Sequence, residues 1–302
     1  MNETRIYRKE VNYRGERLMN IINAIMNIIS TTSRNVENVT TGNNRANNMG
    51  DGLENYIKDM FANTLNVSRN EKIAALSRTF SYLGSKNNSP DAMLRGGDAI
   101  EIKKIESITA DISLNSSHPK RKLCKSDSRV ATSCKTARGD NDWEERDIIY
   151  AVGFIPKDTD TLKMLGMVYG TEYCASSEIY DGIFNAVKEK INEIADFDFT
   201  ETNELAHMNG VDPLERTYWR ARSMWGIKNP WIAFNEAYTY DATKAFSLMC
   251  IINNEKWESL RNTGDLINLS QRDNRVSISD IQVQTPDNAA DLIPAKLIAF
   301  SC

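Results

Sequence analysis

The chain has 302 residues, of which 41% are hydrophobic and 26% charged, with a formal net charge of −4. These values are typical of an ordinary soluble globular chain, with room for one large domain or two small ones. The N-terminal residues contain no apolar secretory core, and no segment approaches the roughly 18 apolar residues of a membrane helix, so we expect a cytoplasmic protein with no membrane partner. Two histidines and five scattered cysteines exclude a multi-histidine metal site and argue against a disulfide framework.

The first predicted element is an amphipathic helix over residues 19–30, in which asparagines form one polar stripe among apolar side chains. We expect its apolar face to pack within the domain, with a second subunit as the alternative. A polar loop is expected over 34–52, followed by a core helix over 53–66. The buried face of that helix would carry Leu53, Tyr56, Ile57, Met60 and Phe61.

Two short motifs flank a Gly96-Gly97 turn: Pro90-Asp91 before it and Glu101-Ile102-Lys103 after it. Two acids and a lysine on one β-hairpin are typical of a metal-dependent nuclease, because a divalent cation held by carboxylates lowers the pKa of water and neutralises phosphate charge. Asp91 and Glu101 would hold the ion, with Ile102 as a further expected ligand. Mg²⁺ suits such oxygen ligands. Lys103 would add a fixed positive charge beside the attacked phosphorus.

The geometry of this hairpin depends on its turn. Side chains alternate along a strand, so Glu101 and Lys103 share one side and Ile102 lies on the other. A two-residue turn would pair Asp91 with Ile102, on the wrong side. A three-residue loop centred on Gly96, or a bulge, would set Asp91 opposite Glu101, and we predict that irregularity.

Both the hairpin motif and Glu54 have a second interpretation without a catalytic role. The hairpin motif also fits a solvated hairpin with no catalytic role, in which Asp91 opens a turn. Glu54, at the edge of the predicted core helix, either forms an exposed ion pair with Lys58 one turn later or points toward the metal site. For an isolated glutamate, the ion pair is favoured.

A basic segment follows the predicted catalytic strand. Between His118 and Arg138, seven lysines and arginines accompany a single acid, Asp127. Although the chain is acidic overall, this local patch would suit a DNA backbone. A solvated charge run is the alternative. The DNA-binding candidates here are Asn115, Ser117, His118, Lys120, Arg121 and Lys122.

The remaining elements complete an α/β pattern. Apolar runs over 147–154 and 162–169 predict buried strands, and 176–194 predicts an amphipathic helix. Together these favour a central mixed sheet flanked by helices. Arg220 and Arg222 lie in an aromatic and basic segment over 216–231 that would either read bases or form core. Beyond about 268 the sequence reads as polar loop, ending in a strand-like tail over 292–302.

Four segments, in order, resemble the NgoPII family of type II restriction endonucleases: Asn43 to Glu54, Phe80 to Ser107, Leu114 to Lys120 and Met167 to Gly170. The similarity runs from about Met19 to at least Ile183. Ser89 stands where the family is expected often to have proline.

The resemblance implies a PD-(D/E)XK restriction-endonuclease-like core, Mg²⁺-dependent double-strand cleavage and a palindromic target, which for the family's namesake is GGCC. It assigns Asp91, Glu101 and Lys103 to the catalytic motif and Glu54 to the helix acid that such folds direct toward the metal. It also implies a cognate DNA methyltransferase that protects the host.

We therefore expect a homodimer acting on double-stranded DNA, because a two-fold protein matches a palindromic site. The expected organisation is a single endonuclease domain over 1–302, with a catalytic core at about 50–195. The N-terminal helix at about 15–32 and the region at about 200–302 would serve dimerisation or DNA recognition. The alternatives are a structure-selective repair or recombination nuclease and a non-catalytic DNA-binding protein.

Overall fold

The computed structural model describes residues 18–36, 45–85, 89–193, 198–200, 202 and 204–302. Part of the predicted polar loop over 34–52 and the first residues of the expected N-terminal helix lie outside these ranges. Within the described part of the chain, no helix has the length and apolar character needed to cross a membrane.

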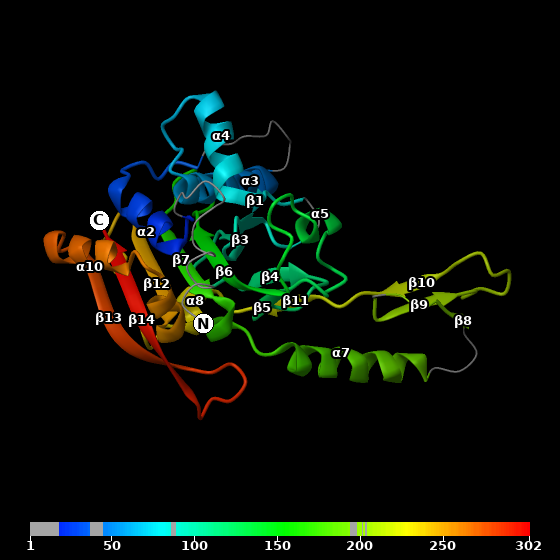
Figure 1. Ribbon diagram of the computed structural model, residues 1–302. Helices are drawn as coiled ribbons and strands as arrows, with labels where there is room; N and C mark the ends of the chain where they lie inside the picture. Colours follow the sequence, from blue (N-terminus) through cyan, green and yellow to red (C-terminus); the bar gives the residue numbers. More distant parts are fainter. Residues whose placement is uncertain (1–17, 37–44, 86–88, 194–197, 201, 203) are drawn as a thin grey trace, which may run out of the picture.

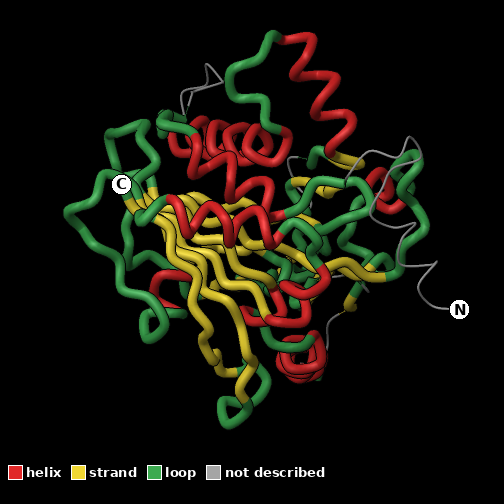
Figure 2. Tube along the Cα trace, turned by 60° about the vertical axis from the view of Figure 1, so that its left-hand side comes forward, coloured by secondary structure: helices red, strands yellow, loops and turns green. Residues whose placement is uncertain are grey.

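A mixed β-sheet forms the centre of the molecule, as the sequence predicted (Figures 1 and 2). Its strands follow the order β1-β2-β3-β6-β7-β12-β14-β13, with β5 attached to β6. The pairs β3–β6 and β7–β12 are parallel, and the other pairs are antiparallel. The strands are β1 (Phe80–Tyr82), β2 (Ala92–Leu94), β3 (Ala99–Ile105), β5 (Lys122–Cys124), β6 (Glu145–Phe154), β7 (Met164–Tyr169), β12 (Ser247–Asn253), β13 (Val276–Gln284) and β14 (Leu292–Ser301).

Two apolar clusters cover the two faces of this sheet, because neighbouring residues along its strands alternate between them. Ile100 and Ile102 belong to the first cluster, whereas Ala99 and Ile105 belong to the second. Helices α2 (Ile21–Ser30), α3 (Arg45–Ala62), α9 (Asn254–Ser259) and α10 (Thr263–Arg272) contribute to the first cluster. The short helices α5 (Thr132–Lys135), α6 (Gly170–Tyr173) and α8 (Pro230–Ala233) contribute to the second. The prediction of a sheet flanked by helices is confirmed.

The helix predicted over 19–30 is present as α2. Asn20 caps it by accepting from the backbone N–H groups of Ile22 and Asn23, and the Asn23 side chain accepts from the Asn20 backbone in return. Ile25 and Ile28 are fully buried. The apolar face of α2 therefore packs into the protein's own core and is not free to bind a second subunit.

Helix α3 buries all five residues predicted for its apolar face: Leu53, Tyr56, Ile57, Met60 and Phe61. It begins at Arg45, so the part of the predicted loop over 45–52 is helical and that prediction was wrong. The first two turns contain asparagine and glycine without an apolar repeat, so the sequence carries no helical pattern before Leu53.

The C-terminal region also departs from the prediction. The residues after 268 were expected to form loop, but they complete α10 and form β13, which pairs with β14 along its whole length. β13 is the last strand of the sheet order, and most of its side chains are not buried. An edge strand of this kind carries polar residues and lacks the apolar run of a central strand. The strand predicted over 292–302 is confirmed as β14.

An arm projects from the body (Figure 1). It consists of α7 (Ser177–Asn192) and a separate sheet of β8 (Asp198–Phe199), β9 (Ala206–Asn209) and β10 (Trp219–Ala221). At its base, β11 (Trp225–Ile227) pairs with β4 (Ile112–Asn115). The helix predicted over 176–194 is thus present, but none of its residues is buried.

The remaining helix, α4 (Arg69–Thr79), links α3 to the first strand of the sheet. Ser68 caps it through a capping box with Glu71. The chain then passes directly into β1, so the edge of the sheet that carries the β2–β3 hairpin is joined to the helical layer.

Candidate active site

The β2–β3 hairpin has the register that the glycine turn predicted. Ala92 pairs with Ile100 and Met93 with Ala99, and the Leu94 N–H donates to the Asp98 carbonyl. The three residues between Leu94 and Asp98 form the loop, and its central Gly96 has a φ of 65°. This register brings Asp91, just before β2, to the side of Glu101 on β3.

The two acids and the lysine meet on one side of the sheet. The Lys103 ammonium lies 2.5 Å from Glu101 Oε1 and 3.8 Å from Asp91 Oδ2. The backbone N–H of Ile102 donates to Asp91 Oδ2 at 2.6 Å, which fixes that carboxyl against the strand. The Asp91 and Glu101 side chains are only 15% and 9% exposed. The arrangement differs from the solvated hairpin considered as an alternative, because both acids are largely withdrawn from water.

Burial and like charge act together on Asp91. Burial is the largest cause, and together with the negative charges of Glu101 and Glu54 it raises the pKa of Asp91 to about 7, although Lys103 and the Ile102 N–H act to lower it. Burial by itself would lower the pKa of Lys103, but the charges of Glu101 and Asp91 outweigh burial and raise it. Lys103 is therefore held in its charged form between the two acids.

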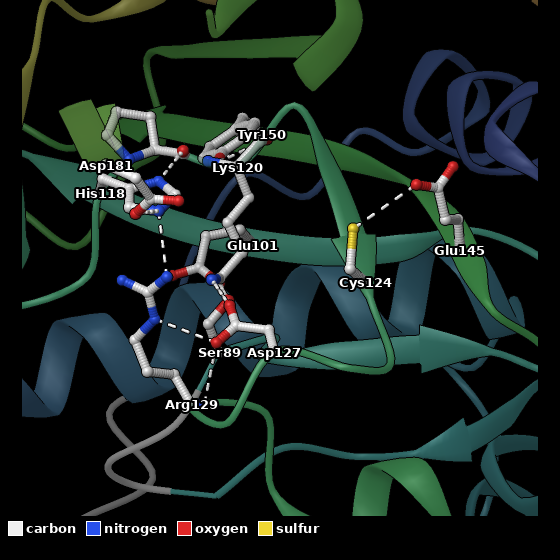
Figure 3. A network of polar contacts seen from close by, with 11 residues as sticks. Ser89, Glu101, His118, Lys120, Cys124, Asp127, Arg129, Glu145, Tyr150 and Asp181 are labelled. Atoms are coloured by element: carbon white, nitrogen blue, oxygen red, sulfur yellow. Dashed lines mark hydrogen bonds and ion pairs between the residues drawn. The ribbon is translucent and has the colours of Figure 1, made fainter. Parts of the chain in front are cut away.

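Ser89 is a contact that the sequence analysis missed. Its hydroxyl donates to Glu101 Oε2 at 2.7 Å (Figure 3). The other carboxylate oxygen, Oε1, faces the Lys103 ammonium. Both oxygens of Glu101 are thus held in place. In the sequence, Ser89 was notable only as a departure from an expected proline, and no spacing rule marks it. Its proximity to Glu101 depends on how the chain enters the hairpin.

Glu54 forms the ion pair that the sequence favoured and also lies close enough to Asp91 and Lys103 to affect their pKa values. It forms an ion pair with Lys58 at 3.1 Å, the expected i,i+4 contact on α3. Its charge also raises the pKa values of Asp91 and Lys103, so it lies within electrostatic range of both. Lys58 in turn donates to the Leu83 carbonyl, which ties the pair to the chain leaving β1.

The donor set fits a hard divalent cation. Among the residues that the structure describes, no group of three or more histidine, cysteine, aspartate or glutamate side chains could hold a metal. Mg²⁺, however, is usually bound by only one or two carboxylates, with water and substrate phosphate completing its shell. Asp91 and Glu101 supply two buried carboxylates on one side of the hairpin, and the cationic Lys103 already lies against both.

The basic segment after β4 carries less uncompensated positive charge in the structure than its count of lysines and arginines suggests. His118 and Lys120 are each only 6% exposed. Lys120 pairs with Asp127, and Arg129 contacts both Asp127 and the His118 ring (Figure 3). Arg121 pairs with Asp287 at 2.5 Å, and Lys122 lies 3.7 Å from Glu145. Asp127 thus compensates two of the cations, and two acids remote in sequence compensate two more, which a count along the chain could not reveal.

The same segment is nevertheless held beside β3, the strand that carries Glu101 and Lys103. Tyr150 on β6 is the register partner of Glu101 on β3. Its hydroxyl accepts from the Lys120 N–H at 2.7 Å and donates to the Lys120 carbonyl at 3.1 Å. Of the other candidates, Asn115 is exposed at the end of β4 and Ser117 is partly exposed. The structure therefore brings this group of candidates near the hairpin.

Arg220 and Arg222 lie elsewhere. Both belong to the arm, away from the β2–β3 hairpin (Figure 1). Glu204 accepts hydrogen bonds from both guanidinium groups, at distances between 2.5 and 2.7 Å. The aromatic residues of the predicted 216–231 segment divide: Trp231 is buried in the core, whereas Tyr218 and Trp219 are exposed on the arm.

The mixed sheet, its flanking helices and the acid-bearing hairpin define a restriction-endonuclease-like α/β core. The family model described as NgoPII restriction endonuclease matches residues 19–284. The type II restriction enzyme NgoPII of Neisseria gonorrhoeae is 49% identical over 282 residues, which is 93% of this chain and 99% of that relative.

The chain therefore belongs to the NgoPII restriction endonuclease family, a family of site-specific endonucleases. This confirms the resemblance that four segments carried, and the family match extends beyond Ile183 into the C-terminal third. No solved structure matches the chain.

Proposed function

We propose that this protein is a type II restriction endonuclease that makes Mg²⁺-dependent double-strand breaks at a short palindromic DNA site, with GGCC as the target. The observation that carries the proposal is the contact of Lys103 with Asp91 and Glu101 on one buried side of the hairpin. Family membership supports the reaction class, and the resemblance to the family's namesake supports GGCC.

In this proposal Asp91, Glu101 and the Ile102 backbone carbonyl hold the cation. When bound, a divalent ion supplies positive charge at the phosphate and makes water a better nucleophile. Water then attacks the phosphorus in line, a new P–O bond forms, and the bond to the 3′ oxygen breaks as that oxygen takes up a proton. Lys103 stabilises the negative charge that develops on the phosphate. Glu54 adds negative charge near the cation.

The protein would act as a homodimer, because a palindromic target presents the same site to each of two subunits. The proposed DNA-contacting group is Asn115, Ser117, His118, Lys120, Arg121 and Lys122, on the segment held beside β3. Within it, the buried His118 and Lys120 would position the segment, and the four accessible residues would contact DNA. Host DNA in the cytoplasm would be protected by a cognate methyltransferase.

Digestion of an unmethylated plasmid with known GGCC sites tests this proposal. In Mg²⁺ the protein should release discrete fragments whose ends map to GGCC, and Asp91→Ala should release none. Asp142→Ala is the matched control, because Asp142 is an exposed acid outside the hairpin. It should cut normally.

Each rival predicts a different outcome. A structure-selective nuclease would cut branched DNA and give no fixed digest. A non-catalytic DNA-binding protein would show salt-dependent binding and no Mg²⁺-dependent product. Fragments that persist in Asp91→Ala would contradict the assignment of the site.

A further inference from the structure

The arm carries an apolar stripe that the described protein leaves uncovered. Ile179, Ile183 and Val187 recur every four residues on α7 and are 42%, 57% and 43% exposed. Ala186 lies on the same side and is also exposed. A Cβ placed on neighbouring Gly182 would have no atom within 4 Å, so that part of the helix is open as well. These five residues are called the α7 stripe below.

A different side of α7 attaches the helix to the body. The Tyr180 ring stacks on the His118 ring with 5.1 Å between their centroids, and it meets the Trp225 ring edge-on with a centroid distance of 5.5 Å. Lys188 donates to the Thr202 carbonyl at 3.1 Å, near the arm's small sheet. α7 therefore has one side that binds the protein and another, the α7 stripe, that no described residue covers. Its apolar spacing is that of a buried helix face, so a partner would complete it.

Charge argues against DNA as that partner. Between residues 177 and 222 the sequence contains ten acidic and five basic side chains. Of the basic ones, Arg220 and Arg222 are paired with Glu204, and Lys190 with Glu193. A surface that binds the phosphate backbone needs an excess of free cationic side chains. The arm has the opposite balance, with twice as many acidic as basic side chains.

We propose that the α7 stripe is the contact between two copies of this chain, with the two α7 helices packed antiparallel about a two-fold axis near Ile183. A single apolar stripe is self-complementary in this arrangement: Ile183 meets its own counterpart, and Ile179 lies against the partner's Val187. Antiparallel packing also brings the N-terminal turn that carries Glu178 to the C-terminal turn that carries Lys190. The exposed Ala186 and Gly182 allow the helices to approach closely.

This inference rests on the proposed function for its two-fold symmetry, and it adds the surface through which the two subunits would contact each other. The N-terminal helix α2, which the sequence offered for dimerisation, is excluded as an apolar contact because its apolar face is buried. The arm supplies a symmetric contact away from the β2–β3 hairpin, so both hairpins stay accessible to DNA.

Sedimentation equilibrium of the full chain, without DNA or metal, is the first test. The wild type should have the mass of two 34.2 kDa chains at micromolar concentration. Ile183→Asp should weaken the dimer at least tenfold or leave a single chain. Ile73→Asp is the matched control, because Ile73 is 58% exposed on α4, close to the 57% of Ile183. It should remain dimeric, and circular dichroism should show both variants folded.

A cross-linking test does not depend on disrupting the contact. Ile183→Cys should form a covalent dimer under mild oxidation, well above the level of the wild type with its native cysteines and of Ile73→Cys. A monomeric wild type, a dimer unaffected by Ile183→Asp, or a cross-link no stronger than that of Ile73→Cys would overturn the proposal. So would an Ile183→Asp variant that keeps its mass but loses DNA binding.

The two proposals fail separately. If the wild type cuts no DNA but has the dimer mass and cross-links at position 183, only the proposed function is lost. If it cuts GGCC as a monomer, the interface and the expected homodimer are lost, but the proposed cleavage reaction stands.

Discussion

At the scale of single residues, the hairpin holds two acids together at an electrostatic cost. Asp91 is buried beside Glu101, and its pKa rises to about 7 as a result. Lys103 offsets part of that repulsion, and Ser89 and the Ile102 N–H hold the carboxylates in fixed positions. Such an arrangement is unfavourable for the free protein and would become favourable with the proposed divalent cation bound, as expected of a functional site.

This pKa predicts how Mg²⁺ binding depends on pH. Cation ligands must be deprotonated, and Asp91 holds a proton in the folded protein below about pH 7. We expect the apparent Mg²⁺ affinity to fall as pH is lowered from 8 to 6, by up to about tenfold per unit below the pKa. Calorimetric titration in buffers of different ionisation enthalpy should detect proton release on binding at pH 7. An affinity constant over this range would contradict the prediction.

The raised pKa of Asp91 also makes the stability of the fold depend on pH. The direction is opposite to that of a salt-bridged acid, whose pKa is lowered. Between the usual pKa of 3.8 and about 7, folded Asp91 binds a proton that the unfolded chain does not. The free energy of unfolding contributed by Asp91 therefore decreases as pH rises through this window. Asp91→Asn should remove that dependence, which thermal melts across the window would measure.

Ser89 is predicted to act as a positioning residue for Glu101. Ser89→Ala removes the hydrogen bond to Glu101 Oε2, so the Mg²⁺ concentration for half-maximal cleavage should rise roughly tenfold, as for other residues that orient metal ligands. Ser89→Thr keeps a hydroxyl and should restore most of the wild-type value. Ser81→Ala is the control, since the Ser81 hydroxyl bonds only the Met93 carbonyl among the described contacts. An unchanged Mg²⁺ dependence in Ser89→Ala would count against this role.

At the scale of elements, close packing decides where the basic segment lies. Gly170 begins α6 directly against residues 120 and 121, and a Cβ there would lie 2.5 Å from the carbonyl oxygens of both Lys120 and Arg121. Those atoms belong to the backbone and cannot rotate away. The approach of α6 thus fixes the segment that Tyr150 also holds beside β3.

Gly170→Ala should therefore destabilise the fold by about 1–3 kcal/mol, the usual cost of overpacking. It should also reduce DNA affinity, because the segment over 118–122 must shift. Gly264→Ala on α10 is the matched control: its Cβ would meet nothing within 4 Å, and the free energy of unfolding should be unchanged or slightly raised. Chemical denaturation measures both. Equal free energies of unfolding for the two variants would contradict the prediction, because the segment would then move aside without cost.

At the scale of the whole molecule, body and arm have different characters. The body buries two apolar clusters around the sheet, whereas α7 has no buried residue. Figure 1 shows α7 extending beyond the body. A helix in that position depends on a partner for its apolar contacts. The proposed dimer would supply them and couple two active sites.

That coupling predicts a change in cleavage products. A dimer on a palindrome should convert supercoiled plasmid with one site directly to linear DNA. A monomeric Ile183→Asp protein should cut one strand at a time, so that nicked circles accumulate. Gel electrophoresis over time distinguishes the two, with Ile73→Asp expected to match the wild type. Direct linearisation by a monomeric variant would argue against coupled strand cleavage.

The local sequence determined the elements whose patterns repeat along the chain: the apolar faces of α2 and α3, the buried strands β6 and β7, and the hairpin register imposed by Gly96. It could not reveal contacts between distant segments, because such contacts leave no repeating pattern in the local sequence. Only the tertiary structure decided that Asp287 and Glu145 pair with two cations of the basic segment, that Ser89 donates to Glu101, and that β13 forms an edge of the sheet. It also decided that α7, amphipathic by sequence, leaves its apolar stripe uncovered, since burial is a property of neighbours and not of spacing.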